Sequence, residues 1–382
     1  IDYATIGNNE GIGLAKEELD CLYEQAKFQP IIGNLKDEGS QPEWAKPYII
    51  HKTKAGTNIA FLAYTFPYYI TYAPNGWQVL EPMARLEEDL GRPEVRDADI
   101  VVVLSHLGVR YDEQIAETYP QVNLVIGSHT HHLFEEGKLV NETYLAAADR
   151  YGYYLGCIDL TVENGQLIEC QIEAIPTKSY ILDLDKEDET FIKAMREEGH
   201  RRLAQKKVAN LGRELDFDET CQLVLQAVCQ ETDSQLTLLN TGLIMKTLGP
   251  QVTMADLQEA LPHQMRMARL VVTGQELKEI CQEVFTKAEL LKNQAIKGMG
   301  FRGKTFGEVI TGNFAYKNGN LLYNRRVVDS NEKFSLVLVD QYYFASYFPT
   351  IKEKEVTLLF PDLLRELVAK YLGKNGANWD KI

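Results

Sequence analysis

Four of the chain's seven histidines directly follow two apolar runs, and their placement suggests metal binding. The run "DIVVVLSHLG" carries His106 near its end, and "VNLVIGSHTHH" carries His129, His131 and His132. Neutral imidazole is a common ligand of divalent transition metals. The ends of these two runs are therefore the candidate metal-binding site of the sequence. Ordinary polar loop residues remain the alternative for any one histidine taken alone.

Two strands and a crossover helix would bring these histidines together. The apolar runs predict buried strands, and "YDEQIAETYP" between them predicts a helix, the pattern of neighbouring parallel strands. Ligands of open α/β sheets gather beyond the carboxyl ends of the strands. We therefore expect His106 and His129 to lie side by side. His129 and His131 would point the same way from an extended backbone, with His132 facing the opposite way.

Other zinc-dependent hydrolases are disfavoured by the motifs that the chain lacks. A metalloprotease would carry His-Glu-x-x-His, and a deaminase would carry Cys-x-x-Cys with its histidine ligand. The sequence contains neither motif. The histidine pattern therefore favours a different class of metal-dependent chemistry.

The rest of the first half predicts an α/β domain. "QPIIGNL" and "NIAFLAYT" predict further buried strands, and "GLAKEELDCLYEQA" predicts a helix. From Tyr144 to Pro176 apolar and polar residues alternate around a turn at Asn164 and Gly165. We expect this segment to form an antiparallel meander that closes the domain.

The second half predicts a separate domain of mixed α and β structure. Thr273 and Glu276 form a capping-box pattern before one amphipathic helix, and "FPDLLRELVAKYLGK" predicts a second helix that ends near Gly373. "KFSLVLVDQYYF" predicts a strand. A charged segment before this half predicts a linker helix beginning near Asp185 or Asp188. The expected division is residues 1–178, a linker over 179–207, and 208–382.

The composition restricts the partners and the compartment. At 382 residues, 45% apolar and 25% charged, the chain is long enough for two domains. A net charge of −15 argues against nucleic acid as a partner, because such binding depends on Lys and Arg contacts with phosphates. No apolar run approaches the roughly 20 residues of a membrane helix, so we expect no membrane partner. The six cysteines, without a Cys-x-x-Cys, predict buried thiols in a reducing, cytoplasmic setting.

These motifs resemble those of a known superfamily. "SHLG" followed by "GSHTHH" resembles the calcineurin-like metallophosphoesterases, and "IGNNEG" at residues 6–11 resembles their Gly-Asn-His-Glu motif. The stretch "LTLLNTGLIMKTLGPQVTMADLQEALPHQMRMARLVVTGQELKEI" resembles the C-terminal domain of the 5′-nucleotidase and UDP-sugar hydrolase family. The resemblance implies a metallophosphoesterase-type α/β sandwich domain, a linker helix and an α+β substrate-binding domain.

The resemblance also implies metal ligands and a reaction. Asn8 would share one divalent ion with His106 and His129, and His131 would bind a second ion. Two such ions, whether Mn, Zn, Co or Fe, would activate a water for attack on a small phosphorylated substrate. Nucleotides are among the substrates that this implies, which would make the protein a phosphatase of nucleotide catabolism.

Three departures from the family pattern accompany this resemblance. The family's Asp-x-His and Gly-Asp motifs precede Gly-Asn-His-Glu, and the chain begins after that point, so we expect it to hold part of the dimetal site and to be inactive by itself. Asn9 stands at the catalytic histidine, and Ile12 stands at that histidine's Asp partner. An amide can bind a phosphate oxygen but cannot donate a proton at neutral pH.

The third departure concerns the substrate domain. Met245 stands where the family has an Arg, and "FASYF" lacks the family's Gly-Gly-Asp-Gly-Tyr run. The substrate-binding positions that carry over are Asn240, Gly242, His263 and Phe348, with His263 replacing a Phe. The alternative function is that of a non-catalytic relative that binds a phosphorylated ligand. The oligomeric state is left open.

Overall fold

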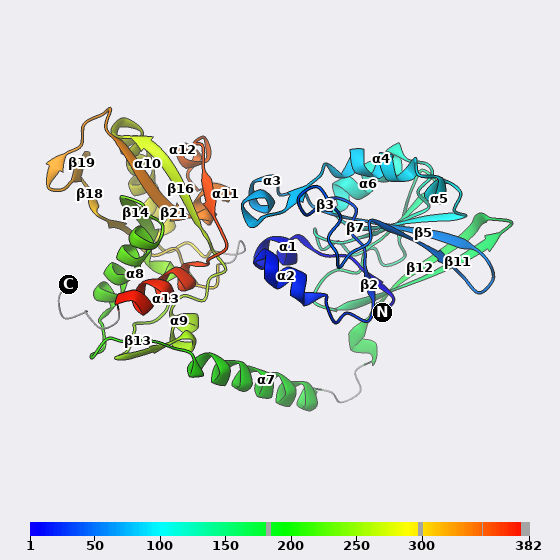
Figure 1. Cartoon of the computed structure of the whole chain (residues 1–382), viewed down its shortest axis with the longest axis horizontal. Coiled ribbons are helices and arrows are strands. Elements are labelled where there is room, and N and C mark those ends of the chain that lie inside the picture. The colour runs from blue at the N-terminus through cyan, green and yellow to red at the C-terminus, as the bar shows by residue number, and fades with distance from the viewer. Residues whose placement is uncertain (181–184, 297–300, 346, 376–382) are drawn as a thin grey trace. The chain divides into compact units, whose positions relative to one another are not determined.

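Each half of the chain is built around its own β-sheet (Figure 1). The structure is a computed structural model that describes residues 1–180, 185–296, 301–345 and 347–375. Its residues divide into two units, Ile1–Asp185 and Lys186–Ile382.

The first unit contains a six-stranded, mostly parallel sheet. In spatial order its strands are β4 (Tyr48–Lys52), β5 (Asn58–Thr65), β7 (Ile100–His106), β8 (Leu124–Gly127), β10 (Thr143–Ala146) and β9 (Lys138–Val140). The four central strands are parallel, and the two edge strands are antiparallel to their neighbours. The predicted crossover helix is α6 (Val109–Thr118), and the strands that it joins are neighbours, as the sequence predicts.

Both faces of this sheet are covered. The helices on one face are α4 (Pro82–Leu90), α5 (Pro93–Arg96) and α6, whose apolar residues share a core with Val101, Val103 and Val125. The other face carries the hairpin of β11 (Tyr154–Glu163) and β12 (Gln166–Pro176), whose inward residues pack on Val102 and Leu124. Burial on both faces explains why the central strands are apolar throughout.

Smaller elements surround the amino-terminal end of the chain. They are β1 (Tyr3–Ala4), α1 (Asn8–Gly13), α2 (Lys16–Leu22), β2 (Gln29–Pro30), β3 (Leu35–Lys36), α3 (Tyr69–Tyr72), the 3-10 helix Ala73–Asn75 and β6 (Gln78–Val79). The four strands among these elements form two short ribbons, β1 with β2 and β3 with β6.

Three predictions for the first unit need correction. "QPIIGNL" is not one strand. Gln29–Pro30 and Leu35–Lys36 belong to two short strands, and between them Ile31 makes only an isolated parallel bridge with Lys46, although Ile31 and Ile32 are fully buried. The helix predicted from "GLAKEELDCLYEQA" is α2, which covers only Lys16–Leu22 and is shorter than the pattern predicts. The segment from Tyr144 is not wholly antiparallel, because β10 pairs in parallel with β8. The turn at Asn164 and Gly165 is confirmed, and both residues have positive φ.

The second unit contains a five-stranded mixed sheet. In spatial order its strands are β17 (Val309–Gly312), β14 (Leu236–Asn240), β21 (Lys333–Val339), β16 (Met267–Thr273) and β22 (Thr357–Leu359). All five residues of β14 are buried, so helices and loops cover both of its faces. The sequence "KFSLVLVDQYYF" predicts a strand that continues to Phe344. The strand ends at Val339, and the last five residues form a short helix instead.

Helices and ribbons complete the second unit. The helices are α7 (Asp185–Gln205), α8 (Phe217–Glu231), α9 (Met254–Ala260), α10 (Gly274–Leu291), α11 (Asp340–Phe344), α12 (Pro349–Lys352), α13 (Leu364–Asn375) and the 3-10 helix Thr241–Leu243. The ribbons join β13 (Lys207–Asn210) to β15 (Gln251–Thr253), and β18 (Phe314–Lys317), β19 (Asn320–Tyr323) and β20 (Arg326–Val327) to one another. The predicted capping box of Thr273 and Glu276 opens α10.

Helix α7 corresponds to the predicted linker helix. It begins at Asp185, where the two units divide, while residues 181–184 of the proposed linker and 376–382 of the proposed second domain lie outside the described residues. The 3-10 turn Thr177–Tyr180 precedes it. The division at 178 and 207 thus remains a proposal.

Two predictions from composition meet the structure here. All six cysteines are free, but only Cys221, Cys229 and Cys281 are buried, so the expectation of six buried thiols is wrong. Within the described residues, no helix combines the length and the apolar character needed to cross a membrane.

Candidate functional site

Three side-chain atoms from distant parts of the first unit converge on one point. Nε2 of His106 lies 2.9 Å from Oδ1 of Asn8, Nδ1 of His129 lies 2.9 Å from the same oxygen, and the two ring nitrogens are 3.3 Å apart. Asn8 begins α1, His106 ends β7, and His129 follows β8 by two residues. The parallel pairing of β7 with β8 places the two histidines at the same end of the sheet.

The amide of Asn8 is oriented with its oxygen toward the imidazoles. Its Nδ2 donates to Oδ1 of Asn9 at 3.3 Å, which leaves Oδ1 facing His106 and His129. Asn8 is only 8% exposed, so this oxygen has little access to water. A buried oxygen that faces two imidazole nitrogens is an arrangement that a cation would stabilise.

Two glycines allow this close approach. A Cβ on Gly7 would lie 2.9 Å from Cε1 of His106, so only glycine admits the imidazole beside Asn8. Gly108 has φ +91°, and a Cβ there would lie 2.8 Å from Cγ2 of Thr130 and 3.3 Å from the ring of His129. Gly7 of "IGNNEG" and Gly108 of "SHLG" thus make room for the imidazoles of His106 and His129.

The loop that follows β8 is strained rather than extended. His129 has φ 69° and His131 has φ 55°, in the left-handed region that side-chain-bearing residues seldom adopt. The expectation of an extended backbone over these residues is therefore wrong. The left-handed backbone at His129 and His131 sets the direction of the His129 imidazole instead. Such strain costs roughly 1–3 kcal/mol per residue and is concentrated at functional sites.

Burial keeps the two converging imidazoles neutral. Burial, and after it the repulsion that a protonated His106 would meet from the imidazolium forms of His129 and His131, lowers the pKa of His106 to about 4. Burial and then His131 also lower the pKa of His129 below its ordinary value. A neutral imidazole retains a lone pair for a metal ion. Both rings are therefore in the ligating form at neutral pH.

The three atoms fit one transition-metal ion. Such ions bind nitrogen and oxygen at about 2.0–2.2 Å, so neighbouring ligands on one ion lie about 2.8–3.6 Å apart, from octahedral to tetrahedral angles. The spacings of 2.9, 2.9 and 3.3 Å match this geometry. Among the described residues, no group of three or more His, Cys, Asp or Glu could hold a metal. With two imidazole nitrogens, the amide oxygen of Asn8 would be the third ligand of such an ion.

The other predicted residues of this unit lie around the three-atom cluster without joining it. His131 is exposed, yet it lies close enough to His106 and His129 to contribute to the lowered pKa of each. Asn9 is also exposed and accepts the hydrogen bond from Asn8. His132 bonds through Nδ1 to the hydroxyl of Thr130 at 2.9 Å, away from the cluster. The structure therefore brings two of the four histidines into contact with Asn8.

An aromatic wall beside His129 could not be found from the sequence pattern. The ring of Phe66 stacks on His129 with centroids 4.9 Å apart and an interplanar angle of 16°, and Tyr68 stands 6.1 Å away. Both residues follow β5, the next strand of the sheet. Three neighbouring strands thus contribute to one site. A signal existed in the run of aromatic residues from Phe66 to Tyr72, but nothing tied it to the histidines.

In the second unit three of the predicted substrate-binding residues, Asn240, His263 and Phe348, are buried, and Gly242 is half-buried. Asn240 donates to the carbonyl of Phe306 and accepts from the hydroxyl of Tyr342 at 2.7 Å. Phe348 is fully buried against the same two rings. His263 is also fully buried, stacks on Phe301 at 4.8 Å, and accepts from the backbone of Arg302.

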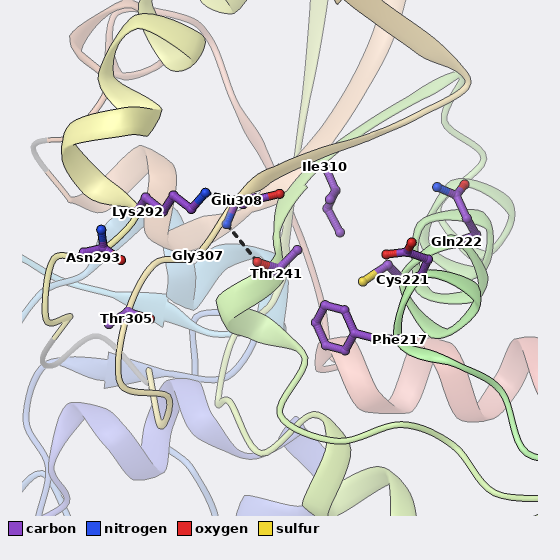
Figure 2. A pocket seen from close by; sticks show the side chains of 11 residues that line it. Phe217, Cys221, Gln222, Thr241, Lys292, Asn293, Thr305, Gly307, Glu308 and Ile310 are labelled. Carbon is purple, nitrogen blue, oxygen red and sulfur yellow. Dashed lines mark hydrogen bonds and ion pairs between the residues drawn. The ribbon is translucent and has the colours of Figure 1, made fainter.

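A cavity of about 530 Å³ lies beside these residues, within the second unit (Figure 2). It opens between the start of α8 and the segment that follows β14. Figure 2 shows the hydroxyl of Thr241 accepting from the backbone of Glu308 at 2.8 Å, and Glu308 pairs with Lys292 at 2.6 Å. Among the residues that line the cavity, Thr241 is the direct sequence neighbour of two predicted substrate-binding residues, Asn240 and Gly242. A Cβ on Gly242 would meet the carbonyl oxygens of Thr305 and Phe306, so this glycine permits backbone packing.

Comparisons with known proteins accord with this architecture. Over 97% of its length the chain is 34% identical to the uncharacterized metallophosphoesterase YunD of Bacillus subtilis (strain 168), and the match spans 83% of that relative. Over 50% of its length it is 21% identical to the trifunctional nucleotide phosphoesterase protein YfkN of the same organism, of which it matches 14%. No family model matches the chain.

Solved structures are similar to both units together. The NAD nucleotidase of Haemophilus influenzae matches 98% of the chain and 82% of its own length, with a TM-score of 0.60 and 14% identity. The 5′-nucleotidase precursor of Thermus thermophilus matches 98% and 81%, with a TM-score of 0.50 and 15% identity. At this identity the likeness concerns the fold alone, and it confirms the predicted α/β and α+β class.

Proposed function

The chain belongs to the metallophosphoesterase family. From this premise we propose that the protein is a metal-dependent phosphoesterase. Its substrate would be a small phosphorylated metabolite, with nucleotides among the candidates. The observation that carries this proposal is the convergence of Asn8, His106 and His129 at ligand-to-ligand spacing. Two neutral imidazoles and an amide oxygen suit Mn, Zn, Co or Fe ions.

The roles proposed for these residues follow from their chemistry. Asn8, His106 and His129 would hold one divalent ion, and His131 would serve a second. Bound divalent ions polarise a phosphoryl oxygen and lower the pKa of water. Asn9 would donate an amide hydrogen bond to a phosphate oxygen, and it cannot supply the leaving group with a proton. The stacked ring of Phe66 would hold the imidazole of His129 in place and shield it from water.

We propose further that the second unit binds the part of the substrate beyond the phosphate. Asn240, Gly242, His263 and Phe348 remain the proposed residues, although the three side chains among them have no face open to a ligand in this conformation. Met245 is 43% exposed and takes the place of an Arg, whose forked donors would bind hydroxyl-rich groups. We therefore expect simple phosphoesters to be hydrolysed and AMP to be bound poorly.

The setting proposed for this activity is the cytoplasm. Six free cysteines, two of them exposed, suit a reducing compartment. The acidic surface, with a net charge of −15, suits a small-molecule substrate better than nucleic acid.

Hydrolysis assays on the purified protein test this function. With Mn²⁺, Co²⁺ or Zn²⁺, an aryl phosphate should be hydrolysed, a chelator should remove the activity, and His129→Ala should abolish it. AMP at matched concentration should be the poorer substrate. Activity that survives both chelation and His129→Ala would contradict the proposal. A strong preference for AMP that Phe348→Ala removes would contradict the expected specificity.

The second candidate function is binding of a phosphorylated ligand without turnover. Asn9, Ile12 and Met245 favour it, because each stands where the family pattern has a side chain with a part in catalysis or in substrate binding. Saturable binding of phosphorylated ligands, with no hydrolysis of any ester under the three metals, would support this alternative against the enzyme.

A further inference from the structure

The imidazole of His106 has a polar neighbour at each of its nitrogens. Nε2 faces Asn8, and Nδ1 lies 2.8 Å from the hydroxyl of Ser128. Ser128 follows β8 and directly precedes His129. The loop that supplies one proposed metal ligand thus also supplies the partner of another.

The direction of the hydrogen bond at Ser128 can be derived. The hydroxyl has one proton, and it donates that proton to the carbonyl oxygen of Ser105 at 3.0 Å, which can only accept. Toward His106 the hydroxyl must therefore act as an acceptor, so Nδ1 carries the hydrogen. A neutral imidazole has a single N–H. Nε2 is then left with a bare lone pair that faces Oδ1 of Asn8.

Ser105 itself is firmly held. Its own hydroxyl donates to the buried carboxyl of Asp112 on α6 and accepts from the backbone of Leu107 at 3.2 Å. A Cβ on Gly127 would meet the same carboxyl, so Ser128 follows a backbone that packs tightly against Asp112. The carbonyl that orients Ser128 is therefore fixed by buried contacts.

We propose that Ser128 is a positioning residue that fixes the tautomer of His106, so that Nε2 presents its lone pair to a metal ion. This inference rests on the proposed metal site and adds a residue to it. Without the Ser128 hydroxyl, Nδ1 loses its acceptor, and the proton can move to Nε2, where it gains a hydrogen bond to Oδ1 of Asn8. That proton would occupy the place of the ion. Outer partners of this kind orient metal-bound histidines, and their loss typically weakens metal binding about 10–100-fold.

The tautomer can be observed without any metal. Nitrogen-15 NMR of the imidazole rings is recorded on the chelator-treated full chain, for the parent, Ser128→Ala and Ser128→Thr. The parent and Ser128→Thr should show His106 protonated on Nδ1, and Ser128→Ala should shift the proton to Nε2. Ser40→Ala, which removes the same atom from another exposed loop, should leave the spectrum of His106 unchanged. A parent protonated on Nε2, or a tautomer unaffected by Ser128→Ala, would overturn the proposal.

A titration with Co²⁺ alone separates this inference from the proposed function. The dissociation constant should rise about 10–100-fold in Ser128→Ala and return close to that of the parent in Ser128→Thr. An equal affinity in Ser128→Ala and the parent would overturn the role of Ser128 in metal binding. A parent that binds no Co²⁺ while showing the Nδ1–H tautomer would refute the metal site and support the hydrogen-bond assignment.

Discussion

Oδ1 of Asn8 lies 2.9 Å from Nε2 of His106, although the two residues are 98 positions apart in the chain. The hydroxyl of Ser128 assigns the only N–H of His106 to Nδ1, so an oxygen lone pair and a nitrogen lone pair face each other. Two such lone pairs repel at this distance unless a proton or a cation lies between them. Nδ1 of His129, within reach of both atoms, is the only group of the cluster that could supply a proton in the absence of metal.

The left-handed backbone at His131 predicts an unusual order of stability for two substitutions. Because φ is 55°, the backbone conformation at this position is roughly 1–2 kcal/mol less favourable for a residue with a Cβ than for glycine. His131→Gly should therefore have a higher free energy of unfolding than His131→Ala, measured by urea denaturation of the metal-free chain. The matched pair at His132, which has no positive φ, should show the ordinary order with alanine the more stable. Alanine being the more stable at both positions would mean that the loop is not strained as described.

Gly7 predicts a steric test of the close approach. In Gly7→Ala the new Cβ would lie 2.9 Å from the ring of His106, which must move away from Asn8. Overpacking of this kind typically costs about 1–3 kcal/mol, and we expect weaker Co²⁺ binding as well as a lower free energy of unfolding. Gly13→Ala is the control, because a Cβ at Gly13 meets nothing within 4 Å. Equal metal affinity in the two variants would show that His106 does not depend on this space.

The buried carboxyl of Asp112 predicts a stability that depends on pH. Burial raises the pKa of Asp112 to about 7 from an ordinary value of 3.8, in spite of the hydrogen bond from Ser105. The folded state therefore holds the proton more tightly than the unfolded state, and folding loses stability as the pH rises from about 3.8 to about 7. Asp112→Asn removes this loss. Its free energy of unfolding should exceed that of the parent by an amount that grows over this range, by at most about 1.4 kcal/mol per pH unit.

The control for this prediction is Glu117→Gln on the exposed side of the same helix, which should change little with pH. Denaturation of the parent and both variants at pH 4.5, 6 and 8 provides the measurement. A difference between Asp112→Asn and the parent that stays constant across these pH values would mean that the carboxyl is ionised in the folded protein throughout.

Asn9 predicts a gain of activity rather than a loss. Asn9→His restores an imidazole where the family motif has one, and general-acid catalysis typically contributes about 10²–10⁴-fold. The kcat for a simple alkyl phosphate should rise toward that range, with a smaller rise for an aryl phosphate, whose leaving group needs less protonation. Equal effects on both esters would argue against proton donation from this position.

The sequence predicts the sheet of the first unit well because its signals are local. The apolar run "NIAFLAYT" matches β5 residue for residue, and His106 ends β7 as expected. "QPIIGNL" fails because its residues pair only briefly and with different partners, Ala4, Lys46 and Val79, so no single strand forms. The side chain of Asn34 within it bonds the backbone N–H and carbonyl of Thr65, so a polar side chain replaces the ladder.

The site itself was only partly predictable. Asn8, His106 and His129 could be selected by motif, but the stacking of Phe66 and the hydrogen bond of Ser128 depend on three-dimensional packing that no sequence period encodes. The left-handed turns at His129 and His131 also reverse what alternation along a strand predicts. In the second unit, Phe348 packs in a buried cluster with Phe306 and Tyr342. In this structure these aromatic rings therefore belong to the core.

The most direct test of the site is a Co²⁺ titration of the metal-free chain, followed by the visible absorption of the bound ion. The parent should bind one ion per chain, weakly, since three ligand atoms converge. Asn8→Ala, His106→Ala and His129→Ala should each reduce or abolish the binding, whereas His132→Ala should leave it unchanged. Binding of two tightly held ions per chain, or binding that the three substitutions do not affect, would contradict the site described here.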